Sequence, residues 1–395
     1  MSKSPRAVIG SAVRTPIGSF NGVFSSVPAT RLGSIAIAEA LKRSRVPPER
    51  VNNVLMGCVL SAGLGQAPAR QASIGAGIPD SVGATTVNKV CGSSITTVIM
   101  ASQAIALGEA GIVVAGGMEN MSRAPYLLEK ARQGYRVGHA ELVDSLIKDG
   151  LWDVYNNFHM GNAGELCAAK FGLTRREVDD FALESYRRAR QAIAAGAFKP
   201  EIVPVCIPQR KGDSVAVADD EEPNRVDLNK MRTLKPAFQA DGVLTVGNSP
   251  SCNDGAAALV VMAEAEAAHL GMTPLARIVG YAEAALAPEW LTIAPVEAIK
   301  RVLKKTGLSL GDIDLFEINE AFSAVALAIN RELGLDEKQV NINGGAVALG
   351  HPIGATGARI LTTLLHAMAA RQARRGLASL CIGGGEALAI IVERM

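Results

Sequence analysis

The order of apolar and polar positions predicts a chain in which short strands alternate with helices. The predicted strands of the first third span 7–13, 51–59 and 112–115, and the predicted helices span 31–43 and 95–107. The strands are short apolar runs, whereas the helices show apolar residues at helical spacing or are apolar throughout. Such an alternation is typical of an α/β fold.

The last third of the chain repeats this order. A strand over 313–318, a helix over 360–370 and a strand over 379–382 follow one another as their counterparts do in the first third. The last of these strands runs into the three glycines 383–385, as the strand over 112–115 runs into two. Several matches in the same order favour two related halves that pack together.

A more polar stretch lies between the two halves and contains most of the tyrosines and several charge-rich runs. A helical pattern over 175–195 argues against a plain linker. We therefore expect an N-terminal half over 1–121 that is completed by about 247–270, an inserted loop domain over 122–246, and a C-terminal half over 271–395.

Composition narrows the class of protein. The 395 residues are 48% hydrophobic and 20% charged, with 4% aromatics, 40 glycines and a net charge of +2. These values fit a globular protein of two or three domains, with no strongly basic surface for nucleic acid. No apolar run reaches the roughly 20 residues that span a bilayer, and the strand-like start leaves no room for a signal peptide.

Six scattered cysteines without a C-x-x-C spacing argue against a zinc ribbon or a disulfide framework. Free thiols fit a reducing compartment, so we expect a cytoplasmic protein without a metal site. There is also no G-x-S-x-G elbow, Walker A loop, H-E-x-x-H helix or complete G-x-G-x-x-G. The commonest hydrolase, NTPase, zinc-peptidase and dinucleotide-binding classes are therefore disfavoured.

The first segment with candidate chemistry contains Cys91, within the sequence NKVCGSS of residues 88–94. A cysteine at a strand-to-helix turn can lie at a helix N-terminus, where the peptide dipoles would lower its pKa and favour the thiolate. Most buried cysteines are inert small hydrophobes, however. Taken alone, the motif leaves both a nucleophile and a core residue open.

The second candidate is His351, in the glycine-rich segment GGAVALGHPIGATG of residues 344–357. Pro352 suits the first turn of a helix, so His351 is expected directly before one. A histidine held there can activate a thiol or polarise a carbonyl. A hydrogen-bonded structural histidine is the alternative, but this much glycine around a rigid turn favours a site.

Two further segments carry reactive or polar groups at strand ends. Cys381 leads into Gly383 and two more glycines, whose bare N–H groups can stabilise an oxyanion. Asn319 begins the sequence NEAF after the strand over 313–318 and can hold a water molecule or a carbonyl group. A buried strand-end cysteine and a helix-capping asparagine are the structural alternatives.

Together these segments resemble the thiolase family, and the resemblance covers nearly the whole chain in order. A second cysteine at the last position distinguishes the chain from the ketoacyl-carrier-protein synthases, which usually pair one cysteine with two histidines. The resemblance implies a duplicated, five-layered α-β-α-β-α core with an inserted loop domain. Further matching stretches are 11–18 (SAVRTPIG), 66–71 (QAPARQ), 115–122 (AGGMENMS), 235–238 (KPAF) and 381–385 (CIGGG).

The family pattern also implies catalytic roles. Cys91 would attack the acyl carbonyl and hold the acyl group, with His351 as its activator, and Cys381 would move the α-proton of the second substrate. His351 and a water held by Asn319 would form the oxyanion hole for the enolate. The backbone N–H groups of Cys91 and Gly383 would form a second oxyanion hole, for the tetrahedral adduct.

For coenzyme A, the resemblance places His159 and Met160 near the pantetheine and acyl end, within the inserted domain. Arg225 is a candidate contact for the nucleotide, with a solvated surface charge as an equal alternative. Most relatives carry a serine that touches pantetheine where Pro250 stands here. Ser249 or Ser251 could then supply the hydroxyl group.

One departure concerns the acyl pocket. Leu291 stands where short-chain relatives often carry a methionine, which leaves the acyl-chain length open. The expected reaction is the reversible condensation of two acetyl-CoA to acetoacetyl-CoA and CoA, or the reverse thiolysis. Alternatives are a longer-chain degradative 3-ketoacyl-CoA thiolase, a carrier-protein condensing enzyme and a non-catalytic CoA- or lipid-binding relative.

The expected partners follow from the same resemblance. Acyl-CoA and CoA are substrates, and no other cofactor is expected. The chain is expected to form a homodimer or homotetramer, with neither nucleic acid nor membrane as a partner.

Overall fold

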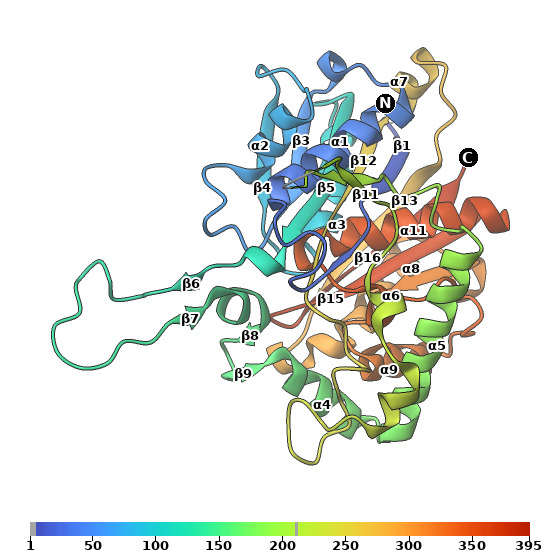
Figure 1. The fold of residues 1–395 in the computed structure, drawn as a ribbon. Coiled ribbons are helices and arrows are strands. Elements are labelled where there is room, and N and C mark those ends of the chain that lie inside the picture. Colours follow the sequence, from blue (N-terminus) through green and yellow to red (C-terminus); the bar gives the residue numbers. More distant parts are fainter. Residues whose placement is uncertain (1–4, 210–211) are drawn as a thin grey trace.

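The computed structural model describes residues 5–209 and 212–395. The first four residues of the expected N-terminal half and two of the expected inserted domain therefore lie outside the described residues. Figure 1 shows a layered body of helices and strands from which one long hairpin projects. Within the described part of the chain, no helix is long and apolar enough to cross a membrane.

The N-terminal half forms a five-stranded arrangement in the order β4-β3-β5-β12-β1. β3 pairs in parallel with β4 and β5, and β12 runs antiparallel to β5 and β1. β5 and β12 are almost completely buried, which explains their continuous runs of small and aliphatic residues. The elements are β1 (Ala7–Arg14), β2 (Gly18–Ser19), α1 (Ala29–Ser44), η1 (Pro48–Arg50), β3 (Asn53–Gly57), α2 (Pro68–Gly75), β4 (Gly83–Val87), α3 (Ser93–Ala106), β5 (Ile112–Asn120), β12 (Asn253–Ala263) and α7 (Glu264–His269).

The C-terminal half repeats this arrangement in the order β14-β15-β16-β13. β14 and β15 are parallel, and the other neighbours are antiparallel. Where β4 would have its counterpart, Val340 forms a single parallel bridge with Phe316 of β14. The elements are β13 (Ala276–Ala285), η5 (Pro288–Ile293), α8 (Ala294–Thr306), η6 (Leu310–Asp312), β14 (Leu315–Ile318), α9 (Ser323–Leu333), α10 (Ala346–Leu349), η7 (Ile353–Ala355), α11 (Thr356–Arg371), β15 (Arg375–Ile382) and β16 (Glu386–Arg394).

Three buried clusters place these elements in five layers. The central cluster joins α3 and α11 to strands of both halves, so this helix pair lies between the two sheet halves. A second cluster packs α1 and α2 on the far side of the N-terminal strands, and a third packs α8 and α9 on the C-terminal strands. β1 and β13 meet through only two residue pairs. The predicted α/β fold with a duplicated five-layered core is therefore confirmed.

β5 departs from the sequence-based prediction of a strand that stops before Gly116. It continues through both glycines to Asn120. A Cβ atom at Gly116 would collide with the carbonyl oxygen of Ala257 on β12, and one at Gly117 would collide with the carbonyl oxygen of Gly354. The glycines therefore allow close approach of neighbouring backbone rather than ending the strand.

The contact at Gly117 leads to a testable expectation for stability. We expect Gly117→Ala to lower the free energy of unfolding by about 1–3 kcal/mol, because a backbone carbonyl cannot move aside as a flexible side chain can. Gly83→Ala is the matched control, since the nearest atom to a Cβ there is 3.9 Å away, on exposed β4. Urea denaturation measures both, and equal stabilities would contradict the close contact.

The segment between the halves extends from the end of β5 to the start of β12. In Figure 1 the hairpin between β6 and β7 projects far from the body, and α4 and α5 lie beside α9 of the C-terminal half. A capping box between Thr174 and Glu177 begins α5. The elements are η2 (Met121–Arg123), β6 (Tyr126–Leu127), β7 (Val143–Asp144), the π-helical turn η3 (Leu146–Leu151), β8 (Trp152–Asp153), β9 (Phe158–His159), α4 (Met160–Lys170), α5 (Arg175–Ala194), β10 (Val205–Ile207), β11 (Val215–Val217), α6 (Glu222–Arg225) and η4 (Leu228–Thr233).

Candidate active site

Cys91 lies in a tight turn directly before α3. The preceding Val90 has a φ of 45°, a left-handed conformation that costs energy for a β-branched side chain. Ser93 holds the turn closed, because its hydroxyl donates to the carbonyl of Val90 (2.6 Å) and accepts from the N–H of Lys89 (2.9 Å). Strained backbone held in this way is concentrated at functional sites. The turn fixes where the thiol points.

The Cys91 thiol meets backbone N–H groups from both halves. Burial raises its pKa to about 12, against the opposing effect of hydrogen bonds from the N–H of Gly383 and from its own N–H. The expected lowering of this pKa by the helix N-terminus is therefore wrong for the unliganded protein, because desolvation of the thiolate outweighs the nearby dipoles. Both N–H groups nevertheless lie near the thiol, and their role as an oxyanion hole stays a prediction.

Cys381 is the penultimate residue of β15, two positions before the first glycine of the turn, and is buried. Burial raises the pKa of its thiol well above the usual range, and the nearby Cys91 adds to this effect. Gly384 and Gly385 have φ values of 91° and 94°, so the turn needs glycine there. The structure thus brings the two candidate cysteines together from opposite halves.

An ion-pair cluster ties the Cys91 turn to the C-terminal half. The ammonium group of Lys89 contacts Glu283 on β13 at 2.7 Å and Glu386 on β16 at 2.5 Å. All three side chains are partly exposed, so each pair alone contributes little free energy. Their position favours the placement of the two halves in which the Cys91 turn lies against Gly383.

His351 is held at two points in a buried loop. Its backbone N–H donates to the side-chain oxygen of Asn253 (2.8 Å), and its ring Nδ1 lies 2.6 Å from the hydroxyl of Thr356. Gly350 has a φ of 102°, and a Cβ there would collide with the Asn253 side chain. Burial lowers the pKa of His351 to about 3, and the nearby Arg359 contributes to this shift. The imidazole is therefore neutral across the physiological range.

The lowered pKa of His351 predicts a pH-dependent stability. In the unfolded chain the imidazole takes up a proton near its ordinary pKa of 6.5, whereas the folded protein does so only near pH 3. The unfolded state thus binds more protons, and stability is lost as pH falls between these values, by up to about 1.4 kcal/mol per pH unit. We expect His351→Asn to lose less stability than the parent protein from pH 7 to pH 4.

Exposed His139 supplies the control for this comparison, because His139→Asn should follow the parent protein. Thermal unfolding over the pH series measures the difference. An equal loss of stability from pH 7 to pH 4 in the parent protein and in His351→Asn would contradict a lowered pKa of His351.

Glu119, at the end of β5, joins the loops around the thiol. Its buried carboxylate accepts hydrogen bonds from the N–H groups of Val59 (3.1 Å), Leu60 (3.1 Å) and Gly354 (2.9 Å). Burial raises its pKa to about 7, although the three N–H groups oppose the shift. The loop after β3 and the segment after His351 are therefore fixed to the same carboxylate.

Asn319 follows β14 and has a buried side chain with two unused polar atoms. Among the residues that the structure describes, neither its amide nitrogen nor its amide oxygen has a hydrogen-bond partner. Buried amide groups without partners are unusual and mark a place for a water molecule or a ligand. The expectation that Asn319 holds a water is consistent with this position.

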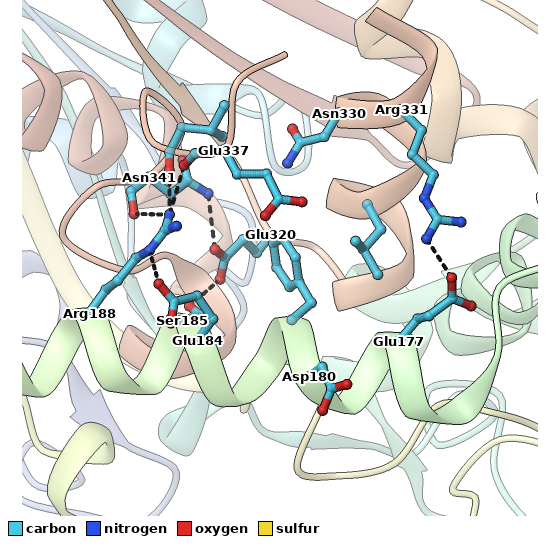
Figure 2. A pocket seen from close by; sticks show the side chains of 13 residues that line it. Glu177, Asp180, Glu184, Ser185, Arg188, Glu320, Asn330, Arg331, Glu337 and Asn341 are labelled. Carbon is cyan, nitrogen blue, oxygen red and sulfur yellow. Dashed lines mark hydrogen bonds and ion pairs between the residues drawn. The ribbon is translucent and has the colours of Figure 1, made fainter. Parts of the chain in front are cut away.

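Glu320, the next residue, connects Asn319 to the glycine-rich loop. Its carboxylate accepts hydrogen bonds from Ser185 of α5 (2.7 Å), from the Asn341 side chain (3.0 Å) and from the N–H of Val347 (3.0 Å). Figure 2 shows Glu320 between Ser185 and Asn341, at a cavity of about 260 Å³ between α5 and α9. Glu320 thus fixes Asn319 and the loop before His351 to the inserted segment.

Met160 and His159 bring the inserted segment to the thiols. A Cβ at Gly383 would lie 3.8 Å from the sulfur of Met160. His159 caps α4 by accepting from the N–H of Gly161 (3.0 Å), and its ring stacks on Phe238, with 5.2 Å between centroids. Burial lowers the pKa of His159. Met160 therefore lies beside the glycine turn, and the contact of both residues with coenzyme A stays a prediction.

The other candidate contacts divide into two groups. Ser249 is buried, and its hydroxyl has no hydrogen-bond partner among residues 5–209 and 212–395. Leu291 is buried in the same apolar cluster as Cys381. Arg225, the last residue of α6, instead pairs with Glu221 directly before that helix (2.7 Å), and its side chain is about half exposed. No described contact joins Arg225 to the residues around Cys91, so its role stays a prediction.

Several residues that build the site were not singled out from the sequence. They are Val90, Glu119, Asn253, Glu320 and Thr356. Each acts through the backbone or through another side chain, and their partners are mostly distant in the chain. The described residues contain no group of three or more His, Cys, Asp or Glu placed to hold a metal ion.

Comparisons with known proteins agree with this geometry. Residues 7–265 match the model of the thiolase N-terminal domain, and residues 272–394 match that of the thiolase C-terminal domain. An acetyl-CoA acetyltransferase of Cupriavidus necator is 54% identical over 388 residues, which are 98% of this chain and 99% of the relative.

Two solved structures have the same fold. The acetyl-CoA acetyltransferase of Bacillus anthracis superposes with a TM-score of 0.97 at 41% identity, and all of both chains is covered. A thiolase of Ascaris suum, solved in complex with coenzyme A, superposes with a TM-score of 0.94 at 44% identity over 99% of this chain and 100% of that one. The predicted family and enzyme class are thereby confirmed: the chain belongs to the thiolase family of acyltransferases.

Proposed function

We propose that the protein is an acetyl-CoA acetyltransferase, which joins two acetyl-CoA molecules into acetoacetyl-CoA and CoA and runs the reverse thiolysis. One observation carries the proposal: the Cys91 thiol lies against the N–H groups of Gly383 and of Cys91 itself, with Cys381 beside it. The full-length likeness to acetyl-CoA acetyltransferases supports the choice of the short acyl group.

In the first half-reaction, His351 accepts the proton of the Cys91 thiol while the sulfur attacks the carbonyl of acetyl-CoA. Both partners are neutral at rest, because burial raises the pKa of the thiol to about 12 and lowers that of the imidazole to about 3. The developing oxyanion accepts hydrogen bonds from the N–H groups of Cys91 and Gly383, each worth roughly 3–4 kcal/mol in such sites. His351 passes this proton to the departing CoA sulfur, so CoA leaves as its thiol and the acetyl group stays on Cys91.

In the second half-reaction, the Cys381 thiol gives its proton to His351, and the resulting thiolate removes the α-proton of another acetyl-CoA. The enolate oxygen accepts hydrogen bonds from His351 and from a water held by Asn319, whose side chain has no other described partner. The enolate carbon then attacks the acetyl group and expels the Cys91 sulfur, which takes its proton back from His351. In thiolysis Cys381 protonates the leaving carbanion, a task that its raised pKa favours.

The inserted segment is proposed to bind coenzyme A. Met160 lies beside Gly383 of the turn after Cys381, and His159, the preceding residue, stacks on Phe238. Both are proposed to contact the acyl and pantetheine end. The buried, unpartnered hydroxyl of Ser249 is available to pantetheine, and half-exposed Arg225 is available to the nucleotide. We further place the enzyme in the cytoplasm, in keeping with its six free thiols.

A thiolysis series of 3-ketoacyl-CoA esters tests the proposed substrate. We expect the four-carbon ester to be cleaved best, because the chain is similar over its full length to acetyl-CoA acetyltransferases. Initial rates at equal enzyme concentration give kcat/KM for each ester. A preference for esters of eight carbons or more would replace the proposal with a longer-chain thiolase, and activity on none would reject both.

The projecting hairpin is proposed to join copies of the chain into a homotetramer built from dimers. It extends from β6 to β7 and projects far from the body (Figure 1). Several of its large apolar side chains are exposed. Side chains of this kind usually mark an interface. They are Tyr126, Leu128, Tyr135, Val137 and Leu142.

Replacing Tyr135, Val137 and Leu142 by serine should therefore reduce the molar mass in solution, with dimers as the expected product. The control replaces exposed polar Gln133 and Glu141 of the same hairpin by serine and should leave the mass unchanged. Sedimentation equilibrium measures both. An unchanged mass in the apolar variant would contradict the interface.

A further inference from the structure

Thr356, the first residue of α11, contacts the imidazole ring of His351 through its hydroxyl group. Its hydroxyl oxygen lies 2.6 Å from His351 Nδ1 and 2.9 Å from the carbonyl oxygen of Pro352. The Thr356 side chain is completely buried, so no solvent molecule reaches it. Both of its contacts are short enough to be hydrogen bonds. One hydroxyl group thus meets a ring nitrogen and a carbonyl at the same time.

Only one tautomer of the neutral imidazole makes both contacts favourable. The carbonyl of Pro352 can only accept, so the hydroxyl proton of Thr356 must point toward it. The hydroxyl oxygen is then an acceptor for the ring, and Nδ1 must carry the imidazole proton. The opposite arrangement would place two oxygen lone pairs against each other at 2.9 Å. Nε2 is left with a free lone pair.

We propose that Thr356 is a positioning residue that fixes His351 as the Nδ1–H tautomer and so makes Nε2 the base for Cys91. This inference rests on the proposed function, in which His351 takes the thiol proton. On attack, the S–H bond of Cys91 breaks and its proton goes to Nε2, while Nδ1 keeps its own proton. The resulting imidazolium still donates through Nδ1 to Thr356, so the same contact serves both charge states.

The backbone contact with Asn253 is separate from this one. The N–H of His351 donates to Asn253 Oδ1 at 2.8 Å, and the Asn253 amide donates to the carbonyl of Gly18 at 3.0 Å. Asn253 therefore holds the backbone of the His351 loop, whereas Thr356 determines which ring nitrogen of His351 carries the proton. A change at Thr356 should alter the protonated nitrogen while the loop stays where Asn253 holds it.

Solid-state ¹⁵N NMR of histidine-labelled protein tests the tautomer directly. The chain has five histidines, and the signals that His351→Asn lacks belong to His351. At neutral pH we expect a pyrrole-like Nδ1 and a pyridine-like Nε2 in the parent protein. A pyridine-like Nδ1 would overturn the inference without any variant of Thr356.

Three variants then separate positioning from packing. Thr356→Val keeps the shape but cannot accept from Nδ1–H, so we expect a shift toward the Nε2–H tautomer and a roughly 10–100-fold slower acetylation of Cys91. Thr356→Ser keeps the hydroxyl and should restore the parent tautomer and rate. KM for acetyl-CoA should not change, because Thr356 is completely buried and its hydroxyl contacts only His351 and Pro352 among the described residues.

Thr362→Val is the matched control on the same helix. Thr362 is also buried, and its hydroxyl has no hydrogen-bond partner among the described residues. It should leave the His351 signals and the acetylation rate unchanged. If Thr356→Val also left both unchanged, Thr356 would be only a packing residue. Full acetylation in His351→Asn would instead reject His351 as the base, and with it the proposed chemistry.

Discussion

Replacing Cys91 with serine should lower the rate of acetoacetyl-CoA thiolysis by a factor on the order of 10⁴ or more. The hydroxyl group fits the same turn and reaches the same N–H groups, but it is far less acidic and less nucleophilic than a thiol. His351 cannot compensate, because burial lowers its pKa to about 3 and leaves it a weak base. Initial rates and the intact mass after incubation with acetyl-CoA measure the effect.

Cys206→Ser provides the control for this substitution, since Cys206 is exposed on β10, away from the turn. The control should retain both turnover and acetylation. If Cys91→Ser retained turnover within tenfold of the parent protein, covalent catalysis through this residue would be refuted.

The second large effect concerns Cys381. Cys381→Ala should still become acetylated on Cys91, because the first half-reaction uses His351 and the two N–H groups. Condensation and thiolysis, which need a proton moved at the α-carbon, should fall by roughly 10²–10⁴-fold. Exchange of labelled CoA into acetyl-CoA reports the first half-reaction alone, and acetoacetyl-CoA turnover reports both.

Cys167→Ala is the matched control, because Cys167 is a buried thiol of the same apolar cluster and has no proposed catalytic role. It should retain the exchange reaction and most of the turnover. Loss of CoA exchange in Cys381→Ala would mean that Cys381 acts in acylation and would contradict the division of labour between the two cysteines.

The sequence could predict the order of elements and the segments of the site for a simple physical reason. Strand residues are apolar runs, and the reactive residues Cys381 and Asn319 come directly at or after strand ends, where an α/β fold exposes side chains. Two similar halves that pack together then bring Cys91 and Cys381 face to face. Such local patterns can be recognised without knowledge of distant contacts.

What could not be predicted depends on contacts between distant parts of the chain. The pKa of Cys91 is raised because neighbours from both halves bury it, which the local helix N-terminus did not indicate. Glu119 binds N–H groups 59 and 235 residues away along the chain. Gly117 was taken as the end of a strand, although the backbone at Gly354 requires it within one.

Thr356 illustrates a different limit. It lies only five residues from His351 in the sequence, yet its effect on the ring depends on where one hydroxyl proton points. That direction follows from the second contact, with the carbonyl of Pro352. A threonine in the first turn of a helix has no such meaning until both distances are known.

The most direct test of the proposed function is to locate the acetyl group on the enzyme itself. The protein is mixed with acetyl-CoA, quenched with acid within one turnover, digested and sequenced by tandem mass spectrometry. We expect one acetyl group per chain, on the thiol of Cys91, which added CoA removes at least as fast as the enzyme turns over. An acetyl group on Cys381 or another residue, or none during turnover, would contradict it.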